Sequence, residues 1–338
     1  MQDMDTTSGL PIVLLTDPID ADALVPLEGV ASIVQLGDPG WEDIVPAVRR
    51  ATIVVVRRQI PAEALADAQH LRALIRNGVG LDFIPVDAAC GMGVAVVNTP
   101  GANARAVAEA VMGMILAGAR RLSVKDRRIR EGQWAELREA AFGEQEIRGK
   151  TLGLVGFGAI AREVARIAHF GFDMSVIAAS RSGKDGLPHV ELAALPTVLS
   201  LADILVLACP LTDETRGMIG PHELAQMKVG AGIVNIARGA VIDEIALAAA
   251  LSSGHLSFAS LDVFCEQPLP ADHPFRELDT CVLTPHTAGI TAQAMAQMSV
   301  MAVEEACRVL NGERPRNLVN RDSWRTIKDR WRILHDCR

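Results

Sequence analysis

Residues 151–171, TLGLVGFGAIAREVARIAHFG, decide the fold. A short apolar run predicts a strand, a glycine turn follows it, and apolar residues at helical spacing then predict a helix. In this GxGxxA turn, Gly156 allows the tight bend, Gly158 lets the backbone approach a pyrophosphate, and Ala161 lets the helix pack close to the strand. Free N–H groups at the start of such a helix bind phosphate. The stretch therefore predicts a dinucleotide-binding unit.

Similar apolar runs lie on both sides of this unit and alternate with alanine-rich helical patterns. The expected strands are residues 11–17, 30–37, 52–58, 71–78, 94–100, 151–157, 174–180, 203–209, 232–238, 258–264 and 281–286, and the clearest helices are about 61–70, 103–122 and 290–311. Such alternation predicts parallel sheets covered by helices on both faces.

The prediction is an α/β protein with two doubly wound parallel-sheet domains of Rossmann or flavodoxin-like type. Residues 102–287 are expected to form the dinucleotide-binding domain, and residues 1–101 with 288–338 the substrate domain. Ligands of such sheets bind beyond the carboxyl ends of the strands, so the active site is expected in the cleft between the domains.

The bulk composition argues against several classes of partner. The chain has 338 residues and a net charge of −8, which disfavours nucleic acid and anionic membranes. No apolar run reaches the roughly 18 residues of a membrane span. The six cysteines show no CxxC spacing, so no metal site is expected and a reduced, cytoplasmic chain is the simpler interpretation.

The end of the strand at 174–180 bears on the choice of cofactor. In NAD-binding units an acidic residue here holds the ribose 2′-hydroxyl. Here Ser180, Arg181 and Ser182 stand where that acid is expected. Forked arginine donors match phosphate oxygens, so the trio favours NADP(H). NAD(H) stays open, because a solvated loop arginine explains the same residues.

Two further strand ends carry residues suited to catalysis. VNIARGAVIDE (234–244) places Arg238 after a strand, and LTPHTAG (283–289) places His286 after another. A histidine that shares a site with an arginine and a dinucleotide is a candidate for proton transfer.

With these residues in place, the chain resembles the D-isomer-specific 2-hydroxyacid dehydrogenases, which include phosphoglycerate dehydrogenases and glyoxylate and hydroxypyruvate reductases. The resemblance covers about residues 50–318 and rests on ordered landmarks such as NGVGLDFIPVDAA, VVNTPGANARAVAEAVM, PLTDETRGMIG and LDVFCEQPLPADHPF. It implies an NAD(P)-dependent oxidoreductase that acts on the CH–OH group of a 2-hydroxyacid. It also implies a homodimer, with the charged stretch 125–134 in the dimer arm.

The resemblance also implies roles for particular residues. Arg238 would bind the substrate carboxylate, His286 would act as acid and base, and Val79, Gly80 and Asn103 would hold the substrate from the other wall. Asp262 would bind the nicotinamide carboxamide. The cofactor residues expected from the turn and the resemblance are Gly156, Gly158, Ala159, Ile160, Ser180, Arg181, Cys209, Pro210, Ala237, Asp262, His286 and Ala288.

Gln267 departs from the family pattern. Most members have a glutamate there, before the proline of FCEQPLP, which hydrogen-bonds the histidine. An amide orients the ring but does not stabilise its charge, so one interpretation is a 2-keto acid reductase with a lowered pH optimum. A second is a formate dehydrogenase-like enzyme, which needs no proton from the histidine. In a third, Glu266 supplies the carboxylate after a one-residue bulge, although adjacent strand residues face opposite ways.

A different class is also open, because C-terminal-binding corepressors share this fold and use the dinucleotide as a signal. The retained Arg238 and His286 favour an enzyme.

The tail, residues 320–338, extends beyond the resemblance. Its Trp324, Ile327, Trp331 and Leu334 fall at helical spacing. We expect an amphipathic helix docked on the first domain or on a partner subunit.

Overall fold

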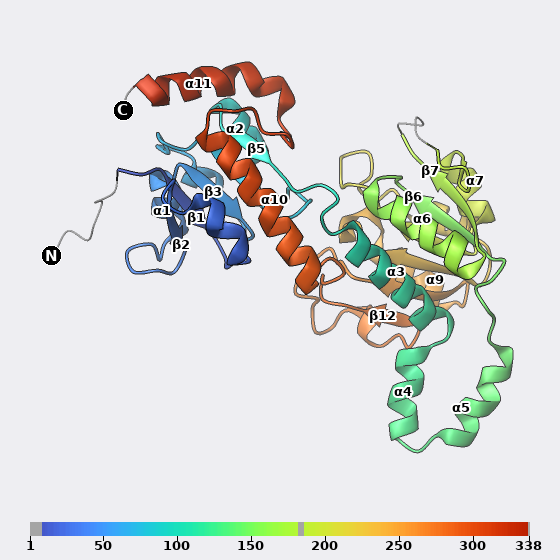
Figure 1. Ribbon diagram of the computed structural model, residues 1–338. Coiled ribbons are helices and arrows are strands. Elements are labelled where there is room, and N and C mark those ends of the chain that lie inside the picture. The colour runs from blue at the N-terminus through green and yellow to red at the C-terminus, as the bar shows by residue number, and fades with distance from the viewer. Residues whose placement is uncertain (1–8, 182–185, 337–338) are drawn as a thin grey trace. The chain divides into compact units, whose positions relative to one another are not determined.

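The computed structural model describes residues 9–181 and 186–336. The chain divides into two compact units: unit 1 is Met1–Asn103 with Thr291–Arg338, and unit 2 is Ala104–Ile290. Each contains a parallel β-sheet flanked by helices (Figure 1). The fold class expected from the sequence, two doubly wound α/β domains, is confirmed.

Unit 1 contains a five-stranded sheet in the order β2-β1-β3-β4-β5, which is the flavodoxin-like order. Its strands are β1 (Ile12–Leu15), β2 (Ser32–Gln35), β3 (Ile53–Val56), β4 (Ala73–Arg76) and β5 (Ala95–Val97). Its helices are η1 (Asp22–Leu27), α1 (Ile44–Arg50), η2 (Ala62–Ala64), α2 (Val86–Gly91), α10 (Ala292–Leu310), η6 (Arg321–Ser323) and α11 (Trp324–Asp336).

Both faces of this sheet are buried, which explains the unbroken apolar runs in the sequence. Val54 and Leu74 belong to the core on one face, whereas Val55 and Ile75 belong to the core on the other. Neighbouring residues of a strand point to opposite faces, so a strand that is covered on both sides must be apolar throughout.

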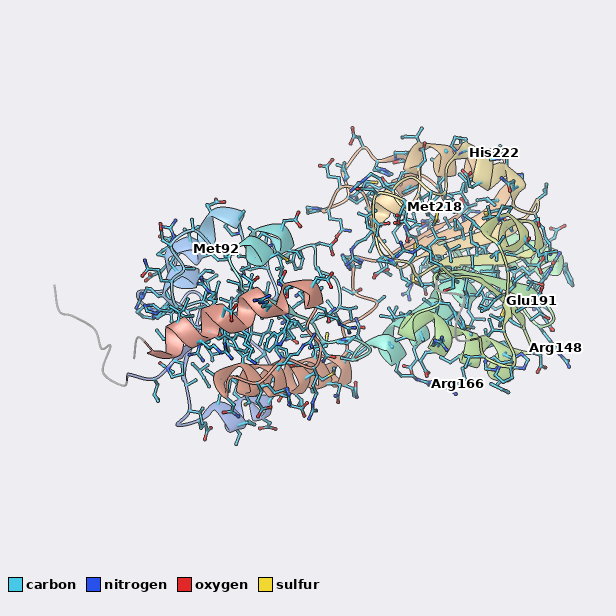
Figure 2. The ribbon with its side chains drawn as sticks, turned by 90° about the horizontal axis from the view of Figure 1, so that it is seen from above. Met92, Arg148, Arg166, Glu191, Met218 and His222 are labelled. Carbon is cyan, nitrogen blue, oxygen red and sulfur yellow. The ribbon has the colours of Figure 1, made fainter. Side chains whose placement is uncertain are left out.

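Unit 2 contains a seven-stranded sheet in the order β12-β11-β10-β9-β6-β7-β8. Its strands are β6 (Thr151–Val155), β7 (Ser175–Ala179), β8 (Glu191–Leu192), β9 (Ile204–Leu207), β10 (Ala231–Asn235), β11 (Leu256–Leu261) and β12 (Cys281–Leu283). Its helices are α3 (Ala104–Ala119), α4 (Leu122–Arg130), α5 (Trp134–Ala140), η3 (Ala141–Gly143), α6 (Ala159–Phe172), α7 (Leu195–Leu201), α8 (Pro221–Gln226), η4 (Gly239–Val241), α9 (Glu244–Ser252) and η5 (Pro274–Arg276). In both units the side chains fill the space between sheet and helices (Figure 2).

The direction of winding in unit 2 reverses between β6 and β9. The chain runs outward from β6 to β7 and β8, then returns to pair β9 with the other side of β6, with Val155 opposite Leu207. Ligands of open parallel sheets bind at such a reversal, outside the carboxyl ends of the strands. The glycine turn that follows β6 and the segment that follows β9 therefore meet at the place where a dinucleotide binds.

Two local expectations are wrong, and one element was not expected. Residues 61–70 do not form a helix, because only Ala62–Ala64 make a 3-10 turn and Asp67 adopts a left-handed conformation with φ 63°. The helix expected at 103–122 ends at Ala119, and Arg121, with φ 49°, separates it from α4. The two-residue strand β8 was not expected, since so short a run has no periodicity to detect.

Helices α4 and α5 form a hairpin that extends from the sheet of unit 2 (Figure 1). Arg127 and Arg128 tie α4 to Asp279, at 2.5 and 2.8 Å, and the hydrogen bond from Arg127 holds the pKa of Asp279 below its usual value. Trp134 and Phe142 are 65% and 87% exposed. Ion pairs and the buried Val124 of α4 thus connect the hairpin to the rest of the unit.

Helix α11 packs on unit 1, as its apolar stripe predicted. Ile327 and Trp331 belong to the core that covers one face of the sheet. The Trp331 Nε1 donates to the Arg72 carbonyl at 3.2 Å, and the Arg330 guanidinium donates to the Ala68 carbonyl at 2.7 Å. No helix in the described part of the chain is long and apolar enough to cross a membrane.

Candidate active site

His286 and Gln267 are in direct contact. His286 Nδ1 lies 3.0 Å from Gln267 Oε1, and Gln267 Nε2 donates to the Phe264 carbonyl at 3.2 Å. The second bond orients the amide, so its oxygen, which only accepts, faces the imidazole. Nδ1 must therefore carry a proton, and the Nε2 of a neutral ring is left as an acceptor. Gln267 stands where most members of the family have a glutamate, and its contact with His286 is the one that the alignment through Pro268 predicted.

Asp262 holds the loop that carries His286. Its Oδ1 accepts from the Thr284 hydroxyl at 2.7 Å and from the Thr287 N–H at 2.9 Å, and its Oδ2 accepts from the Ala288 N–H at 3.0 Å. Asp262 is only 3% exposed, so these bonds compensate a buried carboxylate. His286 has φ 56°, a left-handed conformation that costs an L-residue about 1–2 kcal/mol, and the Asp262 bonds on both sides of it support that conformation.

The role predicted for Asp262, binding the nicotinamide carboxamide, is compatible with this geometry. Two carboxylate oxygens offer about four lone-pair sites, and three are used within the loop. Among the described residues, these bonds leave one acceptor position of Asp262 for a further donor.

Arg238 follows β10 and precedes the 3-10 turn η4. The buried Asn235 shapes this bend, because its Oδ1 accepts from the Ala237 N–H at 3.0 Å and its Nδ2 donates to the Arg238 carbonyl at 3.0 Å. The Arg238 guanidinium bonds the Ala237 carbonyl at 2.6 Å. Sequence reasoning missed Asn235; its place three residues before Arg238, at a strand end, is typical of an amide that closes a turn.

The glycine turn fits a dinucleotide. Gly156 has φ 88°, and a Cβ there would lie 2.8 Å from the Ala208 carbonyl oxygen, so the turn requires glycine. A Cβ on Gly158, by contrast, would meet nothing within 4 Å, which leaves room for a ligand against the backbone. Gly158 is the N-cap of α6, and Ala159 and Ile160 are its first residues, whose N–H groups lack partners within the helix.

The segments that follow β9 and β10 supply the other expected cofactor residues. Cys209 and Ala237 are buried, and the Pro210 carbonyl accepts from the Thr215 hydroxyl at 2.7 Å. Burial raises the pKa of the Cys209 thiol. Burial, followed by the Glu244 carboxylate, raises the pKa of the Cys265 thiol to about 11. Both thiols are therefore protonated at neutral pH and unsuited to act as nucleophiles.

Ser180 and Arg181 follow β7, whereas Ser182 lies outside the described residues. The Arg181 Nη1 lies 2.8 Å from Glu214 Oε2, with the two side chains 71% and 73% exposed. Glu214 also accepts from the Thr212 hydroxyl at 3.3 Å. Sequence reasoning did not identify Glu214 as a partner of Arg181, because the two residues are 33 positions apart.

Unit 1 carries the expected substrate-binding loop after β4. The Gly78 carbonyl accepts from Thr99, the Val79 carbonyl from Asn98 Nδ2 at 2.9 Å, and the Gly80 carbonyl from Arg76 Nε at 3.1 Å. Three consecutive carbonyls are thus engaged by side chains. No described residue accepts a hydrogen bond from the N–H of Val79 or Gly80, so these two amides are available to an anion.

Asn103, the last residue of the amino-terminal part of unit 1, has a buried Oδ1 with no hydrogen-bond partner among the described residues. A buried amide oxygen without a partner is costly, which is consistent with a ligand-binding role. Arg76, Asn98 and Thr99, which hold the loop, were not identified from the sequence.

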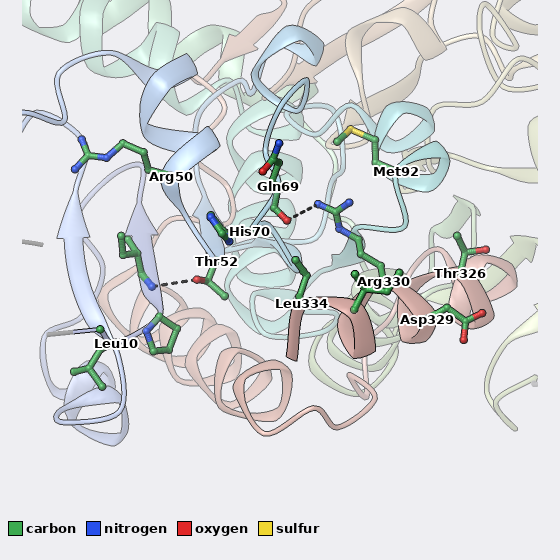
Figure 3. Close-up of a pocket in the computed structure, with 14 residues that line it drawn as sticks. Leu10, Arg50, Thr52, Gln69, His70, Met92, Thr326, Asp329, Arg330 and Leu334 are labelled. Carbon is green, nitrogen blue, oxygen red and sulfur yellow. Dashed lines mark hydrogen bonds between the residues drawn. The ribbon is translucent and has the colours of Figure 1, made fainter. Parts of the chain in front are cut away.

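A hollow of about 940 Å³ lies elsewhere in unit 1, between the start of β1 and α11 (Figure 3). Leu10, Thr52, His70 and Arg330 are among its lining residues, and Arg330 donates across it to the Gln69 carbonyl at 3.3 Å. Neither Val79 nor Gly80 lines it, so its size alone does not make it the active site.

Comparison with known proteins identifies the family. Residues 112–288 match the model of the D-isomer specific 2-hydroxyacid dehydrogenase NAD-binding domain. A glyoxylate reductase of Aeropyrum pernix is 39% identical over 293 residues, which are 84% of this chain and 87% of that protein. The chain belongs to the D-isomer specific 2-hydroxyacid dehydrogenase family. It is therefore an NAD(P)-dependent oxidoreductase, as the resemblance implied.

Other members of the family differ in length. A D-3-phosphoglycerate dehydrogenase of Mycobacterium bovis is 37% identical over 318 residues, which are 92% of this chain but 59% of that protein. A solved structure from Thermus thermophilus has a TM-score of 0.81 and 34% identity, and the match covers 91% of this chain and 99% of that one.

Solved relatives bind both nicotinamide cofactors. A Staphylococcus aureus formate dehydrogenase in complex with NAD has a TM-score of 0.78 and 26% identity, covering 90% of this chain and 97% of that one. A Sinorhizobium meliloti glyoxylate/hydroxypyruvate reductase in complex with NADP has a TM-score of 0.79 and 26% identity, covering 91% and 96%. The more similar relatives are glyoxylate reductases and phosphoglycerate dehydrogenases, so neither the formate nor the corepressor alternative is favoured.

Proposed function

We propose that this enzyme reduces a small 2-keto acid, of the glyoxylate and hydroxypyruvate class, to the corresponding 2-hydroxyacid with NADPH, and catalyses the reverse oxidation. The observation that carries the proposal is the contact of Gln267 Oε1 with His286 Nδ1, which orients the imidazole and fixes its tautomer for proton exchange with a substrate. The substrate class follows the names of the relatives from Aeropyrum pernix and Sinorhizobium meliloti.

The roles of the polar residues follow from the charge that develops in reduction. The bound nicotinamide supplies a hydride, and negative charge grows on the carbonyl oxygen of the substrate. His286 donates its Nε2 proton to that oxygen, and Arg238 binds the carboxylate and stabilises the developing charge. Gln267 keeps the imidazole in the required orientation.

We also propose that the N–H groups of Val79 and Gly80, with the Asn103 side chain, bind the carboxylate of the substrate. Side chains bind all three carbonyls from Gly78 to Gly80 and so fix the backbone of this loop. The N–H groups of Val79 and Gly80 can then act as donors to the substrate. The rest of the substrate is not specified by these contacts.

For the cofactor, we propose a preference for NADPH over NADH. Its support is the Arg181 guanidinium at the end of β7, where an acid would serve NAD. Glu214 pairs with that guanidinium, so NADPH must displace one exposed ion pair. Such a pair contributes about 0–1 kcal/mol, which is less than a phosphate–arginine contact gains.

We further propose a cytoplasmic homodimer whose hairpin, α4 and α5, lies in the subunit interface. The exposed Trp134 and Phe142 supply apolar area of the kind that interfaces bury. Five cysteines of the described chain are free thiols, which suits a reducing compartment.

A substrate panel tests the proposal. NADPH and NADH are each supplied with glyoxylate, hydroxypyruvate, pyruvate and 2-ketobutyrate. Oxidation of formate is assayed separately with NADP. We expect turnover of glyoxylate or hydroxypyruvate, faster with NADPH and abolished by Arg238→Ala. Turnover of formate alone would replace this proposal by the formate dehydrogenase alternative, and cofactor binding without any turnover would indicate a dinucleotide sensor.

A further inference from the structure

The peptide unit that joins Phe264 to Cys265 is held at both ends by side chains. Its carbonyl oxygen accepts from Gln267 Nε2 at 3.2 Å, and its N–H donates to Glu244 Oε1 at 2.9 Å. The carbonyl and N–H of a trans peptide point in opposite directions. Glu244 and Gln267 therefore bind opposite ends of one peptide dipole.

Gly239 covers one face of the same peptide. A Cβ on Gly239 would lie 2.0 Å from the Phe264 carbonyl carbon and 2.1 Å from the Cys265 nitrogen, so only glycine allows this packing. Gly239 directly follows Arg238 in the chain. The peptide thus lies against the bend that presents the substrate-binding arginine and is bonded to the glutamine that orients the histidine.

The Glu244 carboxylate is itself fixed. Glu244 is the first residue of α9, its side chain is 14% exposed, and its Oε2 lies 3.4 Å from His273 Nε2. His273 Nδ1 accepts from the N–H of the buried Phe275 at 3.3 Å, so the proton of a neutral His273 ring is on Nε2 and faces Glu244. Oε1 therefore accepts a backbone hydrogen bond, and Oε2 faces the His273 ring.

We propose that Glu244 is a positioning residue for His286 and acts through the Phe264–Cys265 peptide and Gln267. The chain of contacts runs from Glu244 Oε1 to the Cys265 N–H, and from the Phe264 carbonyl to Gln267 Nε2. It ends at Gln267 Oε1 and His286 Nδ1.

The amide of Gln267 is what makes this support necessary. A glutamate presents an acceptor oxygen to the histidine in either orientation, whereas a glutamine that flips presents NH₂ and opposes a protonated Nδ1. When Glu244 no longer restrains the peptide, the Phe264 carbonyl ceases to select one orientation of the amide. His286 then loses the acceptor that favours its protonated form.

The test uses two substitutions of Glu244 and one substitution of a matched control residue. Each is compared in the presence and absence of Gln267→Ala. Glu244→Ala removes the acceptor for the Cys265 N–H, and Glu244→Gln retains an acceptor oxygen. Glu223→Ala is the matched control, because Glu223 lies in the first turn of α8 and also accepts from a backbone N–H, that of Gly220 at 3.1 Å. Each is made in the wild-type and in the Gln267→Ala background.

The readouts are the pH profile of kcat/KM for keto-acid reduction and the NMR titration of the His286 ring, which is assigned by its loss in His286→Asn. We expect Glu244→Ala to lower kcat/KM at neutral pH by about fivefold to tenfold, which corresponds to one lost hydrogen bond. The falling limb of the profile and the His286 titration should both move to lower pH. Glu244→Gln should restore most of the rate, and Glu223→Ala should change neither readout.

In the Gln267→Ala background, Glu244→Ala should have no further effect on the His286 titration. Independent, multiplicative effects of the two substitutions, or a Glu244→Ala variant that changes only the melting temperature, would overturn the proposal. If Glu244→Ala does not fold, Glu244→Asp, which keeps the charge but shortens the side chain, takes its place under the same criteria. The kinetic readout rests on the proposed acid–base role of His286, whereas the NMR titration needs no substrate. A titration that does not respond to Glu244→Ala would therefore reject the positioning role of Glu244 whether or not the proposed function holds.

Discussion

Two ends of unit 2 contrast in how firmly they hold their functional side chains. The loop after β12 is bound at His286, Thr287 and Ala288, by contacts to Gln267 and to the buried Asp262. The end of β7 presents Arg181 on a side chain that is 71% exposed and forms an ion pair with the equally exposed Glu214. One end is preorganised by several hydrogen bonds, two of them to a buried carboxylate, and the other is held by an exposed ion pair that water and salt weaken.

The difference indicates a division of tasks. The proton transfer proposed for His286 requires the imidazole within a few tenths of an ångström of its productive position, which the several bonds of its loop would provide. The 2′-phosphate recognition proposed for Arg181 needs charge and fork geometry but tolerates movement. We therefore expect large losses of activity from substitutions in the loop after β12, and smaller, cofactor-selective changes from substitutions at the end of β7.

The largest effect is expected for Asp262→Asn. Its amide nitrogen would face one of the loop N–H groups, donor against donor, and the loop would lose the carboxylate that supports His286 in its left-handed conformation. We expect kcat/KM for reduction to fall by about 10²-fold or more, together with a lower melting temperature. The control is Asp126→Asn, an exposed carboxylate paired with Arg130 on α4. A variant within twofold of wild type would show that the loop needs no such anchor.

Gln267→Glu is expected to have a smaller effect of opposite sign. A carboxylate at 3.0 Å stabilises imidazolium, so it should raise the pKa of His286. Reduction uses the protonated ring, which is lost as pH rises through that pKa. The falling limb should therefore move to higher pH, with rates up to about tenfold above wild type on that limb and equal rates below both pKa values. An unchanged profile of kcat/KM against pH would separate Gln267 from proton transfer.

Arg181→Ala tests the exposed end. Loss of forked donors to a 2′-phosphate should weaken NADPH binding by about tenfold to a hundredfold and leave NADH binding within about twofold. Dissociation constants measured by fluorescence titration give both values. Arg166→Ala, an exposed arginine of α6 paired with Glu163, is the matched control. Equal weakening for the two cofactors would remove the argument for a phosphate site.

The smallest effect is expected for Glu214→Gln. This substitution keeps the shape of the side chain but removes the charge that competes for Arg181. NADPH should bind about twofold to fivefold more tightly at low salt, with the gain shrinking as ionic strength rises. NADH binding is the internal control. Weaker NADPH binding would mean that Glu214 helps to position Arg181 rather than compete for it.

Much of the fold could be predicted because its signals are local. Apolar runs identified the strands from β1 to β7 and from β9 to β12, and the three-and-four spacing of Trp324, Ile327 and Trp331 identified the buried face of α11. The helix predicted at residues 61–70 is absent. The alanines of this stretch favour a helix, but Asp67 turns the chain after one 3-10 turn. Propensity is a weak prior that tertiary packing overrides.

The residues of the candidate site were likewise marked by strand ends and motifs, but their partners were not. Asn235 gave only the weak signal of an amide at a strand end, and neither Glu214 nor the bonds by which Asp262 supports the His286 loop gave any.

The sequence by itself determined the family, the order of the strands along the chain and the presence of a glutamine before Pro268. Each depends on residues that are neighbours in the chain, so spacing and residue type suffice to read them. Only the tertiary structure decided which end of the Gln267 amide faces His286. Only it showed that Glu244 and Gln267 bind the same peptide, between Phe264 and Cys265. A hydrogen bond depends on the direction of two groups that folding brings together, and spacing along the chain carries no record of that direction.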